Sequence, residues 1–377
     1  MGKSRLKVMT VIGTRPEIIR LSEVIKRCDR WFEHVLVHTG QNYDYSLNKV
    51  FFEDLGLREP DFYLDAAGSD LGETMGNIIA ASYRVMKQQQ PDALLILGDT
   101  NSALAAIGAK RLKIPIFHME AGNRCFDENV PEETNRRIVD HISDINLPYT
   151  EHSRRYLIGE GIHPERIFVT GSPIKEVIAR NADRIYESDV LERLSLEARK
   201  YILVSAHREE NVDIEENFYQ LMDAINAAAE KYQMPVVYST HPRSLKRIEA
   251  SGFKFHELVR NHEPFGYLDY NKLQQNAFCV LSDSGTLSEE SAMLGFPGVL
   301  IRTSTERPEV LDKGTVIIGG IKRDDVLSAL ELSVSMHEAG EPTSAVPDYT
   351  DKNVSVKVVK LIESYTKIVN NVVWRKA

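Results

Sequence analysis

The chain has 377 residues, of which 46 are basic and 55 acidic, giving a formal net charge of −9. Apolar residues make up 42% and charged residues 27%, a balance typical of globular proteins that excludes a disordered or fibrous chain. The negative charge disfavours nucleic acid or an anionic membrane as the main partner. The length predicts two domains, because one core seldom serves so many residues.

Targeting and membrane signals are missing from the sequence pattern. The charged start runs straight into a strand pattern, without the apolar region of a signal peptide. No apolar run approaches the roughly 20 residues that cross a bilayer. The three cysteines match no metal-ligand spacing, and their odd number indicates a reducing compartment. We therefore expect a soluble, cytoplasmic protein.

Short strand patterns alternate with helical patterns, beginning with a strand pattern over residues 7–13 and a helical pattern over 16–27. Further strand patterns lie at 93–99, 114–120 and 145–150 and, after a restart, at 201–207, 235–241, 277–285 and 298–302. This alternation predicts an α/β protein with parallel sheets. We predict two doubly wound domains, 1–173 and 174–352, followed by a packing helix over 353–377 near the domain junction.

Ligands of open parallel sheets bind beyond the carboxyl ends of the strands, so the residues that follow each strand come first. After the first strand, Gly13 allows a tight turn and Arg15 lies beside the positive start of a helix, where a phosphate fits. Taken alone, this motif is better explained as a capped helix with a solvated arginine. His207 begins the corresponding turn of the second domain, although a lone histidine is more often structural.

Two carboxylates follow the next strand patterns of the first domain. Asp99 is either the N-terminal cap of a helix or a carboxylate at a cleft. Glu120 closes a buried strand, where ionisation without partners is costly. It is therefore expected to meet Arg124 or Arg136, or to work in a pocket.

A charged helix pattern begins at residue 131, with glutamates placed four residues before arginines on neighbouring faces. We predict that Glu133, Arg137 and Asp140 form a solvated stripe of ion pairs. Glu132 and Arg136 share the other face, and we expect that face to point into the cleft with the preceding carboxylates.

The segment SDSGTLSEES follows a strand pattern of the second domain. Ser284, Gly285 and Thr286 can present hydroxyl and backbone N–H groups to a phosphate at a helix start. Glu290 lies one turn further on and could accept ribose hydroxyls, or be an ordinary helix acid. Arg307 adds a cation near the same edge. This segment has the pattern most typical of a nucleotide-diphosphate site.

The motifs GTRPE, GDT, EAG, PEExNR, AHREEN, SDSG and TERPE follow one another between Gly13 and Glu309. In this order they resemble the non-hydrolysing UDP-N-acetylglucosamine 2-epimerase family. The resemblance implies two Rossmann-like domains in a GT-B arrangement, with the active site in the interdomain cleft and UDP mainly on the C-terminal domain. It also implies a homodimer that needs neither a metal nor a nicotinamide cofactor.

The resemblance also implies roles for individual residues. Acid/base or charge-handling work would fall to Asp99, Glu120, Glu132, Arg136 and His207. Contacts with UDP would fall to Arg15, His207, Phe265, Tyr270, Ser284, Gly285, Thr286, Glu290 and Arg307. The chain departs from the family where Arg20 replaces the usual lysine, where Thr286 replaces a glycine, and in the uracil-binding segment that includes Phe265 and Tyr270.

Three variants, HTGQNYDYSLNKVFF, HMEAGNRCFD and EPFGYLDY, resemble the capsule and O-antigen branch of the family. That branch converts UDP-2-acetamido-2,6-dideoxy-L-talose to UDP-N-acetyl-L-fucosamine by eliminating and re-adding UDP through a 2-acetamidoglycal. The alternatives are UDP-N-acetylglucosamine 2-epimerase itself, which makes UDP-N-acetylmannosamine, a GT-B glycosyltransferase, and a non-catalytic UDP-sugar sensor.

Overall fold

The computed structural model describes residues 5–40, 45–128, 130–341 and 344–376. The chain forms two compact units, one made of Met1–Arg180 with Asp348–Ala377 and the other of Asn181–Pro347. Helices α7 and α17 belong to the first unit because both pack against its helix α1. Residues 41–44, part of the sequence variant HTGQNYDYSLNKVFF, lie outside the described ranges.

The described part of the first unit contains a six-stranded parallel sheet, in the order β3-β2-β1-β4-β5-β6. Its strands are β1 (Lys7–Ile12), β2 (Glu33–His38), β3 (Phe62–Tyr63), β4 (Ala93–Leu97), β5 (Ile116–Met119) and β6 (Ile145–Leu147). This is the Rossmann strand order, whose topological switch point lies between β1 and β4.

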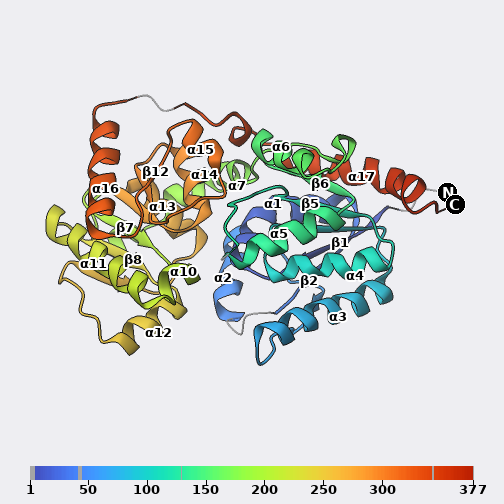
Figure 1. The fold of residues 1–377 in the computed structure, drawn as a ribbon, viewed down its shortest axis with the longest axis horizontal. Coiled ribbons are helices and arrows are strands. Elements are labelled where there is room, and N and C mark those ends of the chain that lie inside the picture. The colour runs from blue at the N-terminus through green and yellow to red at the C-terminus, as the bar shows by residue number, and fades with distance from the viewer. Residues whose placement is uncertain (1–4, 41–44, 129, 342–343, 377) are drawn as a thin grey trace. The chain divides into compact units, whose positions relative to one another are not determined.

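Helices cover this sheet, as Figure 1 shows. They are α1 (Arg15–Trp31), α2 (Tyr45–Leu55), α3 (Leu71–Gln89), α4 (Ala105–Arg111), α5 (Pro131–Ile142), α6 (Glu151–Gly159), α7 (Ile174–Arg180) and α17 (Val354–Val372). On one face, Met9 and Leu94 of the strands pack with Met86 of α3, Ala106 of α4 and Val139 of α5. Because β4 is buried along its whole length, its continuous apolar run suits the centre of a parallel sheet.

The described part of the second unit contains another six-stranded parallel sheet, in the order β12-β11-β10-β7-β8-β9. Its strands are β7 (Ile202–Ser205), β8 (Val236–Ser239), β9 (Val259–His262), β10 (Cys279–Ser282), β11 (Gly298–Leu300) and β12 (Ile317–Ile318). Counted within the unit, the order repeats that of the first sheet, so the switch point lies between β7 and β10. The two Rossmann-like units confirm the predicted α/β fold class.

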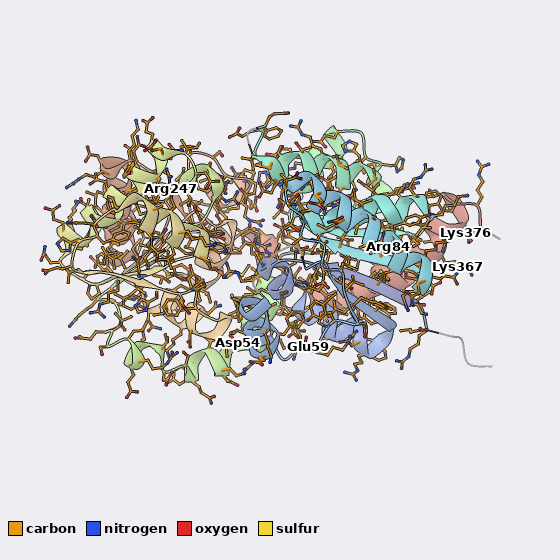
Figure 2. All side chains as sticks on the ribbon, turned by 90° about the horizontal axis from the view of Figure 1, so that it is seen from below. Asp54, Glu59, Arg84, Arg247, Lys367 and Lys376 are labelled. Carbon is orange, nitrogen blue, oxygen red and sulfur yellow. The ribbon has the colours of Figure 1, made fainter. Side chains whose placement is uncertain are left out.

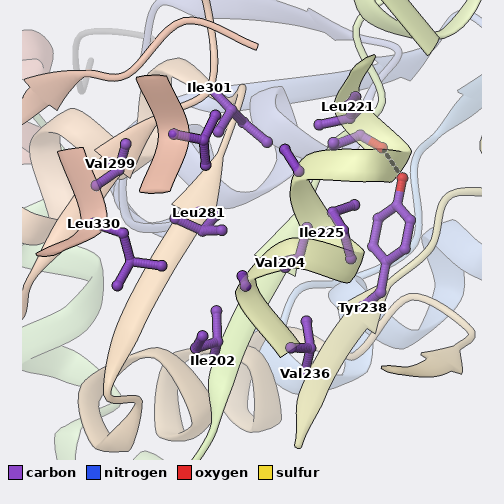
Figure 3. Packing of buried hydrophobic residues seen from close by; sticks show 14 of the residues in the cluster. Ile202, Val204, Leu221, Ile225, Val236, Tyr238, Leu281, Val299, Ile301 and Leu330 are labelled. Atoms are coloured by element: carbon purple, nitrogen blue, oxygen red, sulfur yellow. Dashed lines mark hydrogen bonds between the residues drawn. The ribbon is translucent and has the colours of Figure 1, made fainter. Parts of the chain in front are cut away.

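The second core fills the space between this sheet and its helices (Figure 3). The helices of the second unit are α8 (Ala182–Glu187), α9 (Val190–Arg193), α10 (Glu209–Val212), α11 (Glu215–Tyr232), α12 (Pro242–Ser251), α13 (Tyr267–Asn276), α14 (Gly285–Leu294), α15 (Pro308–Asp312) and α16 (Arg323–Glu338). Leu281 packs with Ile225 of α11 and Leu330 of α16 in one buried cluster. The buried Tyr238 hydroxyl donates to the Ala206 carbonyl at 3.0 Å, which removes the cost of burying it.

Charged side chains project from the outside of each unit, and Figure 2 labels Arg84 of α3 and Lys367 of α17 in the first and Arg247 of α12 in the second. Within the described ranges, every helix is too short or too polar to span a membrane.

Candidate functional site

The carboxyl ends of β4 and β5 bring two of the predicted carboxylates to one edge of the first sheet. Asp99 follows β4 after Gly98, whose φ is +70°, and Glu120 follows β5 with a φ of +62°. A Cβ placed on Gly98 would lie 3.7 Å from Oε2 of Glu120, so that carboxylate lies against the turn that carries Asp99. A left-handed backbone at a glutamate is uncommon, and it directs the Glu120 side chain toward this turn.

The donors that contact Glu120 include side chains from three parts of the first unit. Nη1 of Arg20 lies 3.1 Å from its Oε2, Nδ2 of Asn123 lies 3.3 Å from its Oε1, and the Tyr149 hydroxyl lies 3.5 Å from its Oε2. Arg20 is itself buried, with its guanidinium 5.6 Å from the centre of the Tyr149 ring. The position at which the chain departs from the family's lysine therefore provides the partner of a candidate acid/base group.

Of the alternatives expected for Glu120, the pairing with Arg124 does not occur. Arg124 instead pairs with Asp140 at 2.8 Å and with Glu160 at 2.6 Å, both within the first unit. Arg124 follows the turn after β5, and its buried side chain contacts Asp140 and Glu160 instead of Glu120.

Asp99 forms an ion pair with a different arginine, Arg136. Nε of Arg136 lies 2.7 Å from Oδ2 of Asp99, and Nη1 of the same guanidinium lies 2.8 Å from Oε2 of Glu133. Burial opposes ionisation of Glu133, but hydrogen bonds from Arg136 and the Cys125 backbone outweigh it and hold the pKa of Glu133 below its ordinary value. Arg136 therefore links one candidate acid/base group to a buried, ionised glutamate.

The prediction of a solvated stripe on α5 is wrong for two of its three residues. Glu133 is 1% exposed and Asp140 is fully buried, whereas Arg137 is partly exposed and pairs with Glu128. The spacing of the charges does not specify which face of the helix packs against the rest of the unit. In the structure, Glu133 and Asp140 lie on the packed face of α5. Glu132 lies in the first turn of α5 and is half-buried, where its charge also suits the positive helix start.

Glu17 is a site residue that the motif analysis missed. It is 1% exposed and accepts hydrogen bonds from the Gly13 N–H at 3.0 Å and the Thr14 hydroxyl at 2.8 Å. The Ser102 hydroxyl, in the short 3-10 helix η1 (Asn101–Leu104) after Asp99, also donates to it. The side chain thus ties the turn after β1 to the loop after β4. The spacing T-x-x-E at a helix start, typical of a capping box, was the available signal.

Replacing Glu17 with Gln is expected to change how stability depends on pH. Burial raises the pKa of Glu17 from 4.5 to about 7. Between those two values the folded state binds more protons than the unfolded state, so this group makes stability fall as the pH rises. Glutamine resembles the protonated form and can donate to Ser102. The variant should match wild type near pH 4.5 and exceed it by up to about 3 kcal/mol above pH 7. Urea unfolding at both pH values measures this, and parallel stability curves would contradict it.

The switch point of the second unit carries His207, and Asp283 positions it. Oδ2 of the buried Asp283 accepts from the backbone N–H groups of His207 and Arg208, each at 2.9 Å, and from Asn211 at 3.1 Å. The His207 side chain is 41% exposed, and its Nδ1 lies 3.6 Å from the other Asp283 oxygen. The backbone at His207 is therefore anchored, while its side chain stays partly exposed. Asp283, within the SDSG motif, was not singled out from the sequence.

Helix α14 begins at the end of β10, as the diphosphate hypothesis requires. Ser284 is its N-cap, and the hydroxyl oxygen accepts from the Thr286 N–H at 3.3 Å. A Cβ on Gly285 would lie 2.5 Å from Oε1 of Glu306, so a larger residue at the first position of the helix would have to displace that carboxylate. Glu290, one turn further on, is buried.

The remaining predicted UDP contacts lie around these strand ends. Arg307 is buried, pairs with Glu289 at 2.7 Å and donates to the Gly285 carbonyl at 3.2 Å. Its side chain therefore contacts the start of α14 through a hydrogen bond from within the fold. The pKa of Tyr270 is raised by burial and then by the nearby Glu290 carboxylate.

Two predicted contacts are less enclosed. The half-buried Phe265 has its ring centre 5.6 Å from that of His262. Arg15, in the first unit, is also half-buried and lies with its guanidinium 5.9 Å from the centre of the Phe51 ring. Among the residues that the structure describes, no group of three or more His, Cys, Asp or Glu side chains is arranged to hold a metal ion.

Comparison with known proteins adds an independent result. A family model described as UDP-N-acetylglucosamine 2-epimerase matches residues 26–363. The structure of UDP-N-acetylglucosamine 2-epimerase from Rickettsia bellii is 45% identical, with a TM-score of 0.91, and the match covers 99% of this chain and 100% of that one. Methanocaldococcus jannaschii UDP-GlcNAc 2-epimerase, solved in complex with UDP-GlcNAc and UDP, is 31% identical, with a TM-score of 0.89 and coverage of 95% and 99%. A relative from Pseudomonas aeruginosa, UDP-2,3-diacetamido-2,3-dideoxy-D-glucuronate 2-epimerase, is 32% identical over 92% of this chain and 100% of its own length.

Proposed function

The chain belongs to the UDP-N-acetylglucosamine 2-epimerase family and is an isomerase, and on that premise we propose that it converts UDP-2-acetamido-2,6-dideoxy-L-talose to UDP-N-acetyl-L-fucosamine. The relative from Methanocaldococcus jannaschii, solved with UDP-GlcNAc and UDP, supports a UDP-sugar as the substrate. The sequence variants of the capsule and O-antigen branch support the 6-deoxy sugar.

The proposed reaction avoids direct removal of the C2 proton, which is not acidic beside an acetamido group. The C1–O bond breaks and its electron pair leaves with UDP. The C2 proton passes to a carboxylate, and the C2–H electron pair forms the C1=C2 double bond of a 2-acetamidoglycal. A proton then arrives at the opposite face of C2, and UDP adds back to C1. Two faces require two separately positioned acid/base groups.

The observation that carries this proposal is the pair of carboxylates at the ends of neighbouring strands, each with its own arginine. Asp99 pairs with Arg136 at 2.7 Å and Glu120 pairs with Arg20 at 3.1 Å. Two separately held carboxylates suit two proton transfers, and Glu132 on α5 is the third candidate. A binding protein for an anionic UDP-sugar would bind more strongly without these negative charges, which argues against a sensor.

In the second unit, His207 and the start of α14 would stabilise the charge that develops on the departing diphosphate. Backbone N–H groups at a helix start bind phosphate well because they are unpaired donors aligned with the helix dipole. We propose the same role for Arg15 of the first unit. Ser284, Gly285 and Thr286 would provide the helix-start contacts, Glu290 would accept ribose hydroxyls, and Phe265 and Tyr270 would lie near the uracil.

Product analysis with both UDP-sugars tests the substrate. The protein is incubated in deuterated water with the talose-type substrate or with UDP-N-acetylglucosamine, without any acceptor, and the products are followed by NMR. We expect deuterium at C2 and inversion of the talose-type sugar. Conversion of only the glucosamine compound would establish the alternative, UDP-N-acetylglucosamine 2-epimerase. Absence of C2 exchange with both sugars would favour a glycosyltransferase instead.

We further propose that the enzyme works as a cytoplasmic homodimer, without a metal or a nicotinamide cofactor. Treatment with EDTA is expected to leave the rate of C2 exchange unchanged, because carboxylates and backbone donors perform the chemistry. Loss of activity that a divalent cation restores would contradict this. Light scattering of the purified protein measures the oligomeric state.

A further inference from the structure

A buried cluster of charged side chains lies behind the two turns that carry Asp99 and Glu120. It consists of His118 on β5, Arg124, Asp140 on α5 and Glu160 after α6. The side chains of His118, Arg124 and Asp140 are at most 1% exposed. Burying charged groups so completely is costly unless they are paired, so their mutual contacts determine which charges they carry.

Both ring nitrogens of His118 face oxygen acceptors. Nε2 lies 2.8 Å from the Gly98 carbonyl oxygen, and Nδ1 lies 2.9 Å from Oδ1 of Asp140 in an ion-pair contact that is poorly aligned for a hydrogen bond. A neutral ring that donates from Nε2 to Gly98 would leave the lone pair of Nδ1 beside the negative Asp140 carboxylate. A ring with a proton on each nitrogen keeps the bond to Gly98 and makes the Asp140 contact an ion pair.

The other contacts of Asp140 agree with a positive charge on His118. Oδ2 of Asp140 lies 2.8 Å from Nη1 of Arg124, and the carboxylate also accepts from the Gly122 N–H at 3.1 Å. Arg124 is in turn paired with Glu160. With His118 protonated the four groups carry two positive and two negative charges, so the charges balance within the cluster, at whose edge Glu160 is partly exposed.

The cluster forms hydrogen bonds with the backbone next to both carboxylates. His118 holds the carbonyl of Gly98, which directly precedes Asp99, and Asp140 holds the N–H of Gly122, two residues after Glu120. Gly98, Glu120 and Gly122 have φ values of +70°, +62° and +81°, so both turns pass through left-handed backbone, which glycine adopts readily and glutamate only rarely. Contacts that hold such turns fix where the carboxylates point.

We infer that His118 is a positioning residue of the epimerase. As a doubly protonated imidazolium it would, together with Asp140, hold the turns that carry Asp99 and Glu120 in the conformation that places both carboxylates. The inference rests on the proposed function only for its effect on rate. The protonation of the ring follows from contacts within the first unit and is tested without substrate.

The test compares His118→Gln with His34→Gln. His34 is equally buried and also contacts a carboxylate, with its Nδ1 2.6 Å from Asp29, but its Nε2 faces the Thr10 hydroxyl, which can donate or accept. It lies on β2, near the amino end of the strand and away from the candidate site. We expect His118→Gln to lower the rate of C2 exchange by about 10- to 100-fold, because small misplacements of catalytic groups have effects of this size. UDP affinity should stay within about twofold of wild type, and His34→Gln should keep a near-normal rate.

Nitrogen-15 NMR of the imidazole rings in the wild-type protein gives the second readout. We expect both His118 nitrogens to show protonated-type shifts at neutral pH, with the His118→Gln variant identifying the signals through their loss. If that variant does not fold, a second variant, Asp140→Asn, assigns the ring through the displacement of its signals. A His118 nitrogen without a proton would overturn the inference, as would a folded His118→Gln variant that exchanges C2 as fast as His34→Gln. If wild type exchanges neither UDP-sugar, the proposed function fails while the NMR result still decides the state of the ring.

Discussion

Asp99→Asn and Glu120→Gln are each expected to slow exchange of solvent deuterium into C2 at least ~10²-fold, the usual scale for loss of a positioned proton-transfer group. Both substitutions preserve shape and remove the ability to take up a proton. The same is expected for Glu132→Gln. UDP affinity should stay close to wild type, because the diphosphate contacts proposed above lie mainly on the second unit. Isothermal calorimetry with UDP and NMR of C2 exchange measure the two quantities.

Structural roles for these carboxylates would give a different pattern. If Asp99 and Glu120 served only as ion-pair partners of Arg136 and Arg20, the amide variants would melt at lower temperatures and lose little rate. Glu128→Gln is the matched control, since Glu128 is 78% exposed and pairs with Arg137 at the surface near α5. That control should change neither rate nor melting temperature. Near-normal exchange in all three folded variants would refute the acid/base assignment.

Gly122→Ala is expected to destabilise the first unit by roughly 3 kcal/mol or more, since overpacking and left-handed strain each cost about 1–3 kcal/mol. The φ of Gly122 is +81°, and a Cβ there would lie 2.5 Å from the Ser153 carbonyl oxygen and 2.8 Å from Cγ of Leu157. Both neighbours belong to α6 and lack room to move. The displaced turn follows Glu120 directly, so activity should fall along with stability.

The Gly161→Ala variant separates the cost of left-handed backbone strain from the cost of overpacking. Gly161 has a similar φ of +89°, but a Cβ there would meet nothing within 4 Å. This variant should therefore show only the backbone strain, about 1–2 kcal/mol, and keep full activity. Urea unfolding of the two variants gives the difference. Equal destabilisation by both would show that the close approach at Gly122 relaxes at little cost.

Much of the fold and the location of the candidate site could be predicted from local patterns. The apolar runs that become β4, β5, β7 and β10 are short, bounded by turns and followed by helical periodicity, and each of these signals lies within about a dozen residues. Because ligands of parallel sheets gather at the carboxyl ends of strands, the residues that follow these runs, Asp99, Glu120, His207 and Ser284, were found without knowledge of the strand order.

Which side chains meet at those ends was decided by the tertiary structure alone. Arg20 and Glu120 are 100 residues apart in sequence, and Glu17 and Ser102 are 85 apart. Their contacts exist because β1, β4 and β5 lie side by side in the sheet, an order that local patterns do not specify. The burial of Glu133 likewise depends on how α5 is rotated against the sheet. A sequence pattern fixes the spacing of charges along a helix or strand, but their ionisation and pairing depend on burial and on neighbours brought in by distant segments.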